Sequence, residues 1–108
     1  MNPLLPVFAA LSDPTRFAIV ERLLAEGEQS AGGLQAVADI TAPAISRHLK
    51  VLREAGVIRQ RIDAQRRYYS AVPEPLAAIA RWTGNHRVFW ETALDRLEAA
   101  IKSQSPKE

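Results

Sequence analysis

Apolar residues recur at helical spacing through the first part of the chain. A short helix is expected over about residues 3–11, on Leu4, Leu5, Val7, Phe8 and Leu11. A second helix is expected over about residues 14–26, with an inward side formed by Phe17, Ile19, Val20, Leu23 and Leu24. Asp13 is a favourable N-cap for this helix, Pro14 suits its first turn, and Gly27 suits its end.

Two further helices follow, with a tight connection between them. The first covers about residues 30–38, and we expect Ser30 to cap it and Leu34 and Val37 to be buried. The connection takes residues 39–41, and Thr41 caps a helix over about residues 42–55 that ends at Gly56. The buried side of this last helix has members at i, i+4 and i+7, namely Ile45, Leu49 and Leu52.

After Gly56 the pattern becomes that of two strands, residues 57–62 and 66–72, around a turn at residues 63–65. Alternation places Arg59 and Arg61 on one face of the first strand, and Ile58, Gln60 and Ile62 on the other. Tyr68 and Tyr69 then point to opposite faces, so one of them is expected in the core. From Pro73 to about Lys102 the pattern is helical again, with a bend or break at Gly84 and Asn85.

This order of elements predicts a winged helix-turn-helix, which is a mostly α-helical fold with a two-stranded β-wing. The length of 108 residues fits one domain. We expect that domain to cover residues 1–102, followed by a frayed tail over residues 103–108.

Composition narrows the class of protein further. The chain has no cysteine, which excludes disulfides, thiolate metal sites and cysteine-based redox sensing. No apolar run approaches the roughly 20 residues of a membrane-spanning helix, and the first residues lack the basic start of a signal peptide. We therefore expect a cytoplasmic protein with no membrane partner.

Positive charge is concentrated in one part of a nearly neutral chain. The formal net charge is only +2, yet residues 47–67 contain seven Lys or Arg residues and His48, against the two acids Glu54 and Asp63. Such a basic stripe favours a polyanionic partner. The alternative is an ordinary solvated charged face.

Three separated blocks of the sequence resemble the ArsR family of winged helix-turn-helix transcriptional regulators. In chain order they read ALSDPTRFAIVERLLAEGE, APAISRHLKVLREAGVIRQR and RRYYS. The likeness covers about residues 5–72, with a looser likeness in the last helix. It implies a homodimeric repressor that binds operator DNA and releases it on a signal.

The chain departs from that family at its sensor sites. Many members bind metals through Glu-x-Cys-x-Cys-x-Leu, and here Ser30 and Gly32 stand at the cysteine positions of EQSAGGL. Other members use an Asp-x-His and a distant His-x-x-Glu in the C-terminal helix, where this chain has only His86. The wing turn, DAQ, also lacks the glycine common in the family. We expect neither a metal nor a cofactor.

The helix over residues 42–55 is the expected DNA-reading element. A helix fits the major groove, about 12 Å wide, and residues near its N-terminus reach the base edges. We expect small residues there to allow close approach, Arg47 to bind guanine through two hydrogen bonds, and His48 and Lys50 to meet phosphates. The full set of expected DNA-binding residues is Thr41, Ala42, Pro43, Ser46, Arg47, His48, Lys50, Arg59, Arg61, Arg66 and Arg67.

Several of these residues have a simpler interpretation. Ser46 can be merely a small exposed residue, and Arg47 can be the ion-pair partner of a glutamate. His48 can pack against the third helix instead of meeting a phosphate. Tyr68 and Tyr69 are weak candidates for base stacking, because a duplex offers no splayed base.

The first and last helices carry more large apolar side chains than one small core can cover, so a two-fold dimer is expected to bury them. The expected interface consists of Leu4, Leu5, Phe8, Trp82, Phe89, Trp90, Leu94, Leu97 and Ile101. The alternative is that these residues close the core of a monomer. A third use of the last helix, a metal site on Glu91, Asp95 and Glu98, is less favoured, because Arg87 and Lys102 supply ordinary ion pairs there.

The function favoured by these patterns is a sequence-specific regulator, a repressor that binds a palindromic operator as a homodimer. An enzyme is not expected, because no nucleophile–base pair and no glycine-rich phosphate loop is readable. The alternative is a winged helix used only for protein–protein contact, which has little use for Arg47 together with an arginine-rich wing. The release signal stays open between a small organic ligand at the interface near Trp82, Phe89 and Trp90 and no ligand at all.

Overall fold

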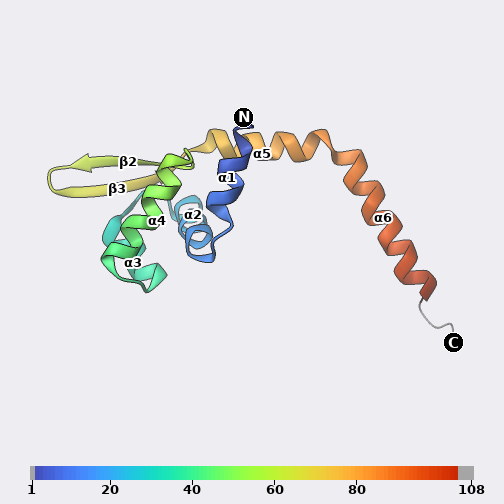
Figure 1. Ribbon diagram of the computed structural model, residues 1–108, viewed down its shortest axis with the longest axis horizontal. Helices are drawn as coiled ribbons and strands as arrows, with labels where there is room; N and C mark the ends of the chain where they lie inside the picture. The colour runs from blue at the N-terminus through green and yellow to red at the C-terminus, as the bar shows by residue number, and fades with distance from the viewer. Residues whose placement is uncertain (1, 105–108) are drawn as a thin grey trace. The chain divides into compact units, whose positions relative to one another are not determined.

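The computed structural model describes residues 2–104, and the chain divides into two units between Ala78 and Ile79. Figure 1 shows the elements in chain order. They are α1 (Leu4–Leu11), α2 (Pro14–Glu26), β1 (Gln29–Ser30), α3 (Ala31–Ala38), α4 (Ala42–Glu54), β2 (Ile58–Asp63), β3 (Arg66–Ala71), α5 (Pro73–Asn85) and α6 (Arg87–Gln104).

The helix ends of the first unit lie where the capping residues predict them. The N–H of Arg16 donates to the Asp13 carboxylate over 3.0 Å, which starts α2. Gly27 ends α2 with a φ of 78°, a conformation that favours glycine, and its N–H donates to the Leu23 carbonyl. The helix expected over residues 14–26 is therefore confirmed. Both of its end signals are local in the sequence.

The expectation of a two-stranded sheet is wrong by one strand. The sheet is antiparallel with the order β1–β3–β2, and Gln29 and Ser30 of β1 pair with Tyr69 and Tyr68 of β3. The backbone of Ser30 is already extended before it caps α3, so these two residues can add to the edge of β3. A two-residue strand shows no alternation, and the sequence pattern therefore did not reveal it.

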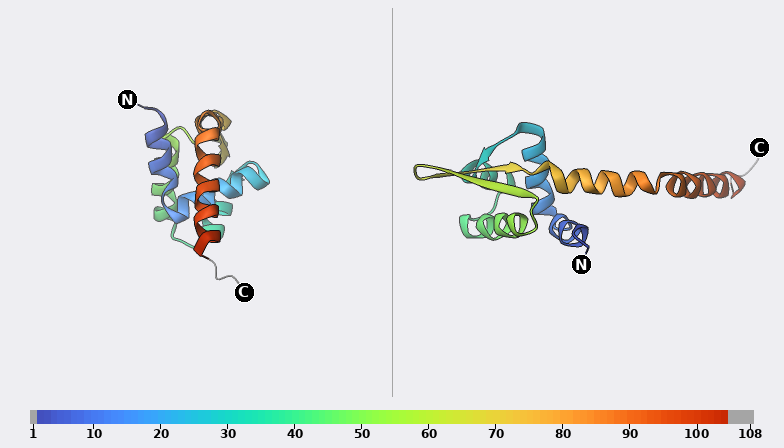
Figure 2. Two further views of the ribbon diagram at one scale, coloured as in Figure 1. Left: turned by 90° about the vertical axis from the view of Figure 1, so that its right-hand side faces the viewer. Right: turned by 90° about the horizontal axis from the view of Figure 1, so that it is seen from above.

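The wing is the hairpin formed by β2 and β3, with Ile58 paired to Ala71 at its base and Asp63 paired to Arg66 at its tip. Figures 1 and 2 show this hairpin extending beyond α4. Tyr69 is the buried tyrosine of the pair, as one of the two was expected to be. Ile62, expected on the same face as Ile58, is exposed, because it lies near the tip.

The buried core belongs to the first unit and draws on α1, α2, α3, α4, β2 and β3. It consists of Val7, Ala10, Ile19, Val20, Leu23, Leu34, Ile45, Leu49, Leu52, Val57, Ile58 and Tyr69. Ile45, Leu49 and Leu52 form the buried side of α4, as expected.

Three residues expected inside are on the surface. The exposed fractions of Phe17 and Leu24 are 50% and 58%, and Val37 is exposed as well. Both α2 residues lie about 100° around the helix from the centre of the side formed by Ile19, Val20 and Leu23. One face of α2 is enough to meet the core, and residues on the flank stay in solvent.

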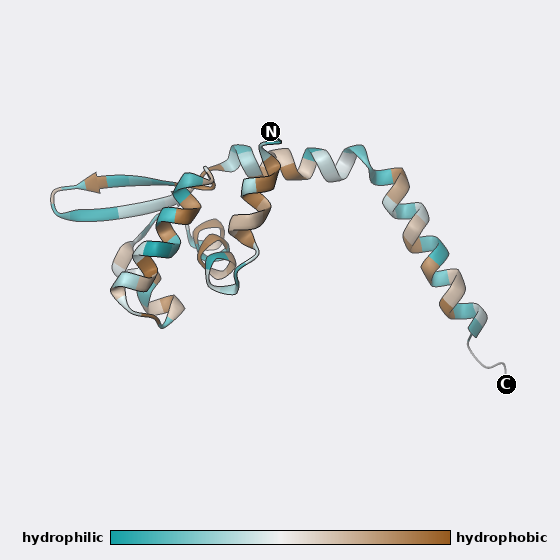
Figure 3. Ribbon diagram, in the orientation of Figure 1, coloured by the Kyte–Doolittle hydropathy of each residue, from teal (hydrophilic) through white to brown (hydrophobic). Residues whose placement is uncertain are grey.

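The expected break near Gly84 and Asn85 is confirmed, since α5 ends at Asn85 and α6 begins at Arg87. Within residues 79–104 no residue is buried. Figure 3 shows hydrophobic residues recurring along α6. The tail expected over residues 103–108 lies outside the described residues from Ser105 on. No helix within residues 2–104 is long and apolar enough to cross a membrane.

Candidate nucleic-acid interface

The connection between α3 and α4 is short because each helix is closed by its own residue. Asp39 ends α3 with a φ of 53°, and its N–H donates to the Gln35 carbonyl. Aspartate is one of the few residue types that tolerates this left-handed conformation. Two residues later the Thr41 hydroxyl accepts from the N–H of Ala44 over 3.3 Å and starts α4. The pair of helices therefore has the tight turn of a helix-turn-helix.

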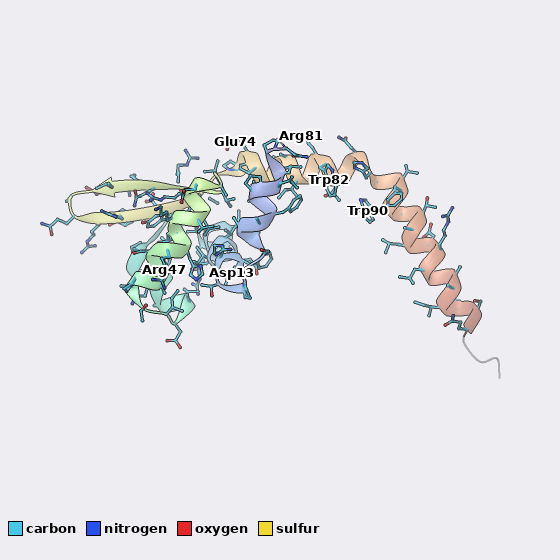
Figure 4. All side chains as sticks on the ribbon, viewed as in Figure 1. Asp13, Arg47, Glu74, Arg81, Trp82 and Trp90 are labelled. Carbon is cyan, nitrogen blue, oxygen red and sulfur yellow. The ribbon has the colours of Figure 1, made fainter. Side chains whose placement is uncertain are left out.

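The outer side of α4 carries most of the residues expected to read DNA. Opposite the buried Ile45, Leu49 and Leu52, the residues Thr41, Ala42, Pro43, Ser46, Arg47 and Lys50 are all exposed. No ion pair joins Arg47 to a carboxylate among residues 2–104. Arg47, labelled on α4 in Figure 4, thus has no counter-ion in the part of the chain that the structure describes.

His48 differs from its neighbours because it is half-buried against the start of α2. Its Nδ1 lies 3.3 Å from Nη1 of Arg16 and 3.8 Å from Oδ2 of Asp13. Arginine can only donate, so a hydrogen bond at this contact makes Nδ1 the acceptor and leaves the ring hydrogen on Nε2. Arg16 is itself fixed, since its Nε donates to the Ala10 carbonyl over 2.7 Å. His48 is therefore held by the α2 start while its Nε2 is a donor.

Asp13 serves both α2 and this junction. Its pKa lies below the ordinary value for a carboxyl, because its oxygen accepts the Arg16 N–H and because the positive charge of Arg16 favours the anion, although desolvation opposes the shift. Asp13, the N-cap of α2, thus also places a negative charge beside His48 of α4.

The wing presents three arginines to solvent. Arg59 lies on β2, and Arg66 and Arg67 lie directly after the turn at Ala64 and Gln65. Arg66 and Arg67 also line a hollow of about 390 Å³ together with the first turn of α3, at Ser30, Ala31 and Gly32. The structure therefore brings the arginines of the wing tip beside the helix-turn-helix.

Arg61 is placed differently from the other wing arginines. Its Nη2 and Nε donate to the two Glu28 oxygens over 2.7 and 3.1 Å, and its Cζ lies 4.6 Å from the ring centre of Tyr68. Asp63 is a further charge nearby, with 3.9 Å between its Oδ2 and Nη1 of Arg61. Hydrogen bonding to Arg61 lowers the pKa of Glu28, and the same contact raises the pKa of Arg61.

Sequence reasoning missed the partners of these side chains. Glu28 and Arg61 are 33 positions apart in the sequence, and Arg16 and His48 are 32 positions apart. No local spacing therefore links the members of either pair. The only signal was that Asp13 is an acid at a helix start and that Glu28 is an acid just before β1. Knowing the strand order would have placed Glu28 near β3, and only then near Arg61.

Two of the three carboxylates of α6, Glu91 and Glu98, form ordinary ion pairs. Nε of Arg87 donates to Oε1 of Glu91, and Lys102 pairs with Glu98, both over 2.9 Å. Within residues 2–104 no group of three or more His, Cys, Asp or Glu side chains is arranged to hold a metal ion.

Comparison with known proteins places the chain among regulators of transcription. A protein-family profile described as a helix-turn-helix domain matches residues 11–61. The HTH-type transcriptional regulator Rv2034 of Mycobacterium tuberculosis is 42% identical over 95 residues, covering 88% of this chain and 85% of that protein. The arsenical resistance operon repressor of Escherichia coli is 31% identical over 105 residues, covering 95% and 87%. The structure of an ArsR-like transcriptional regulator from Rhodococcus sp. RHA1 superposes with a TM-score of 0.70 at 32% identity, covering 98% and 95%.

Proposed function

The chain belongs to the ArsR family of winged helix-turn-helix transcriptional regulators and is a DNA-binding regulator, and we propose that it represses transcription by binding a palindromic operator as a homodimer. The observation that carries this proposal is the pairing of two basic features in one unit. The outer side of α4 is polar and basic, and the wing beside it exposes Arg59, Arg66 and Arg67.

In this proposal α4 lies in the major groove and reads the bases. Ala42 and Pro43 allow the backbone to come close, Ser46 bonds to a base or phosphate, and Arg47 binds guanine. The exposure of these residues supports this assignment, as does the lack of a carboxylate paired with Arg47 among the described residues 2–104.

Groups that flank the outer side of α4 would contact the phosphate backbones on either side of the groove. Lys50 and Nε2 of His48 contact phosphates. The start of α4, capped by Thr41, places its backbone N–H groups and the positive end of the helix dipole near a further phosphate. On the wing, Arg59, Arg66 and Arg67 contact a neighbouring stretch of backbone or minor groove. Arg61, which was expected in the same group, is instead paired with Glu28.

The proposed dimer interface is formed by α1 and α6. Trp90, Leu94, Leu97 and Ile101 recur along α6 at i, i+4, i+7 and i+11, which makes one apolar stripe, and Leu94 and Leu97 are 63% and 56% exposed in a single copy. Leu5 on α1 is also largely exposed. The remaining members are Leu4, Phe8, Trp82 and Phe89. A second copy would remove this surface from water and place two recognition helices about 34 Å apart, one turn of DNA.

We also propose that the release signal is a small organic molecule that binds at the dimer interface, where α5 meets α6. A hollow of about 510 Å³ lies there, lined by Ala80, Thr83, Gly84, Arg87, Trp90, Glu91 and Leu94. Its walls are mostly apolar with one charged pair at the edge, which suits a partly aromatic ligand that carries a single polar group. Trp90 fluorescence titrated with candidate compounds would test this, and a signal that moves with none of them would argue for regulation without a ligand.

The experiment that tests operator binding is a binding assay with the DNA that flanks the gene of this protein. Arg47→Ala and Arg66→Ala are expected to weaken binding. Arg22→Ala is the matched control, because it removes the same charge from α2, where Arg22 is paired with Glu26. If neither of the first two changes weakens binding relative to the control, the proposed DNA contacts are wrong, and a wild-type protein indifferent to every duplex would exclude the function itself.

A further inference from the structure

The side chain of Arg61 crosses the sheet from β2 to the segment before β1. Arg61 is paired with Tyr68 of β3, and Tyr68 is paired on its other edge with Ser30 of β1. Directly opposed residues share a face, so the guanidinium passes over the Tyr68 ring and then reaches Glu28. One long side chain therefore spans all three strands in the middle of the wing.

The other face of the wing is tied to α4. Gln60, paired with Tyr69, donates from Nε2 to the Tyr69 hydroxyl over 2.8 Å. Nη1 of Arg53, near the end of α4, donates to Oε1 of Gln60 over 2.7 Å. The wing is thus fixed to α4 on one face and to the segment that leads into α3 on the other.

The contact of Arg61 with Glu28 has the geometry of a structural pair. Two parallel N–H···O bonds to one carboxylate, with an aromatic face beneath the guanidinium, define both position and orientation. A DNA phosphate would have to displace a carboxylate that satisfies the same donors, and it would leave Glu28 as an unpaired anion close to the DNA. Arg59, Arg66 and Arg67 have no comparable ion pair within residues 2–104.

We propose that Arg61 is a positioning residue and not a DNA contact: clamped by Glu28 across Tyr68, it sets the direction of the wing so that Arg59, Arg66 and Arg67 meet the duplex. This proposal rests on the proposed function, since the direction of the wing matters only if the wing binds DNA. It assigns Glu28, which carries no positive charge, to the DNA-binding machinery as the partner that fixes Arg61.

Substitution by lysine distinguishes an arginine that contacts a phosphate from one that positions the wing. Lysine serves well as a point charge on a phosphate, but it cannot make the two-pronged bond that Glu28 accepts from Arg61. The test therefore measures the dissociation constant and its salt dependence, on the duplex bound by the wild type, for Arg61→Lys, Arg61→Gln and Glu28→Gln. Arg66→Lys and Arg66→Gln are the matched controls for a true phosphate contact on the same wing.

We expect all three changes at the clamp to weaken binding by a similar factor, about 2–5-fold, as loss of a well-formed surface pair implies. The slope of log K against log salt should stay at the wild-type value in all three, because the loosened wing still reaches the same phosphates in the complex and only the cost of orienting it lowers the affinity. Arg66→Gln should instead reduce that slope by about 0.9 per subunit, and Arg66→Lys should preserve it. Thermal unfolding of each variant shows the folded fraction, and the slope does not depend on it.

Three outcomes would overturn the proposal. If Arg61→Gln lowers the slope while Arg61→Lys preserves it, Arg61 contacts a phosphate. If Glu28→Gln tightens binding and steepens the slope, Glu28 withholds Arg61 from the DNA. Wild-type behaviour of all three variants would mean that the clamp has no part in binding. Each of these leaves the proposed function intact, whereas a wild-type protein without salt-dependent duplex binding would remove the function as well.

Discussion

Ala64 lies in a backbone conformation that glycine adopts more easily. It has a φ of 57° and is the first of two turn residues between the paired Asp63 and Arg66. In two-residue hairpins a positive φ at this first position alone belongs to the type II′ turn, in which glycine is preferred. An alanine here is strained by its Cβ, by about 1 kcal/mol.

Ala64→Gly is therefore expected to leave the free energy of unfolding unchanged or raise it by up to about 1 kcal/mol, because relief of the strain outweighs the extra freedom of glycine in the unfolded chain. Gln65→Gly is the control, since Gln65 has no positive φ and should lose about 0.5 kcal/mol. Urea denaturation of the two variants measures the difference. A clear loss of stability in Ala64→Gly would contradict the assigned strain.

The lowered pKa of Asp13 links stability to acid pH. The folded state binds the proton less readily than the unfolded chain, so the contribution of Asp13 is present above the ordinary carboxyl pKa, near pH 4, and is lost as the pH falls through the lower folded value. Asp13→Asn keeps an oxygen to cap α2 but cannot titrate. We expect the variant to lose less stability than the wild type between about pH 5 and about pH 2.5, measured by urea denaturation.

Glu28 contributes to the same acid range, since Arg61 lowers its pKa too. Glu28→Gln should therefore remove a separate part of the acid dependence, and the double variant should be flatter than either single one. Identical pH profiles for the wild type and Asp13→Asn would show that the carboxylate is no better stabilised in the folded state than in the unfolded one.

At the scale of elements, the start of α4 depends on one hydroxyl. Thr41 accepts from the N–H of Ala44, and its exposed side chain has no part in the core. Thr41→Ala is expected to cost about 1 kcal/mol of unfolding free energy by loss of the cap, and Thr41→Ser should retain most of it. Chemical denaturation measures both. Equal stability of the alanine and serine variants would mean that the cap bond does not contribute.

The helices were predictable because their signals are local. Asp13, Ser30 and Thr41 each cap the helix that the sequence assigned to them, and Gly27 ends α2 as expected. The third strand was not predictable, because a two-residue strand has no period of its own and depends on β3, nearly forty positions away. The exposure of Phe17 was not predictable for a similar reason, because only the packing of α2 against its neighbours decides which flank of the helix is covered.

In the candidate site, too, the features set by local spacing were predictable and those set by the fold were not. Solvent exposure of Ser46, Arg47 and Lys50 follows from the spacing of Ile45, Leu49 and Leu52 on one helix, which the sequence displays. The engagement of Arg61 with Glu28 follows from the sheet order, which the sequence does not display. A count of basic residues identified the region, and only the fold distinguishes an arginine free to meet DNA from one already held.

At the scale of the whole molecule, the apolar stripe of α6 predicts how a dimer can be broken. Leu97 lies within the stripe, and Ala99 lies on the opposite side of the same helix, roughly 170° from its centre. Leu97→Glu is expected to convert the protein to a monomer, because the new charge would be desolvated at the interface. Ala99→Glu adds the same side chain in solvent and should leave the dimer intact.

Sedimentation velocity at several protein concentrations distinguishes these states. The expected result is a concentration-dependent dimer for the wild type and for Ala99→Glu, and a monomer for Leu97→Glu. A monomeric wild type would contradict the dimer proposal directly. A Leu97→Glu protein that still dimerises would place the interface elsewhere on the molecule.

The salt dependence of DNA binding connects the dimer to the contacts of each subunit. With three or four phosphate contacts per subunit, a dimer neutralises about 6–8 phosphates, so log K should fall against log salt with a slope of about −5 to −7. The monomeric Leu97→Glu protein engages a single half-site and should show about half of that slope, with weaker binding at every salt concentration. Fluorescence anisotropy of a labelled duplex between about 50 and 200 mM salt measures both slopes. A flat response in the wild type would mean that the arginines of the wing and of α4 do not meet the phosphate backbone, and a full slope in the monomer would mean that one subunit supplies all of the contacts.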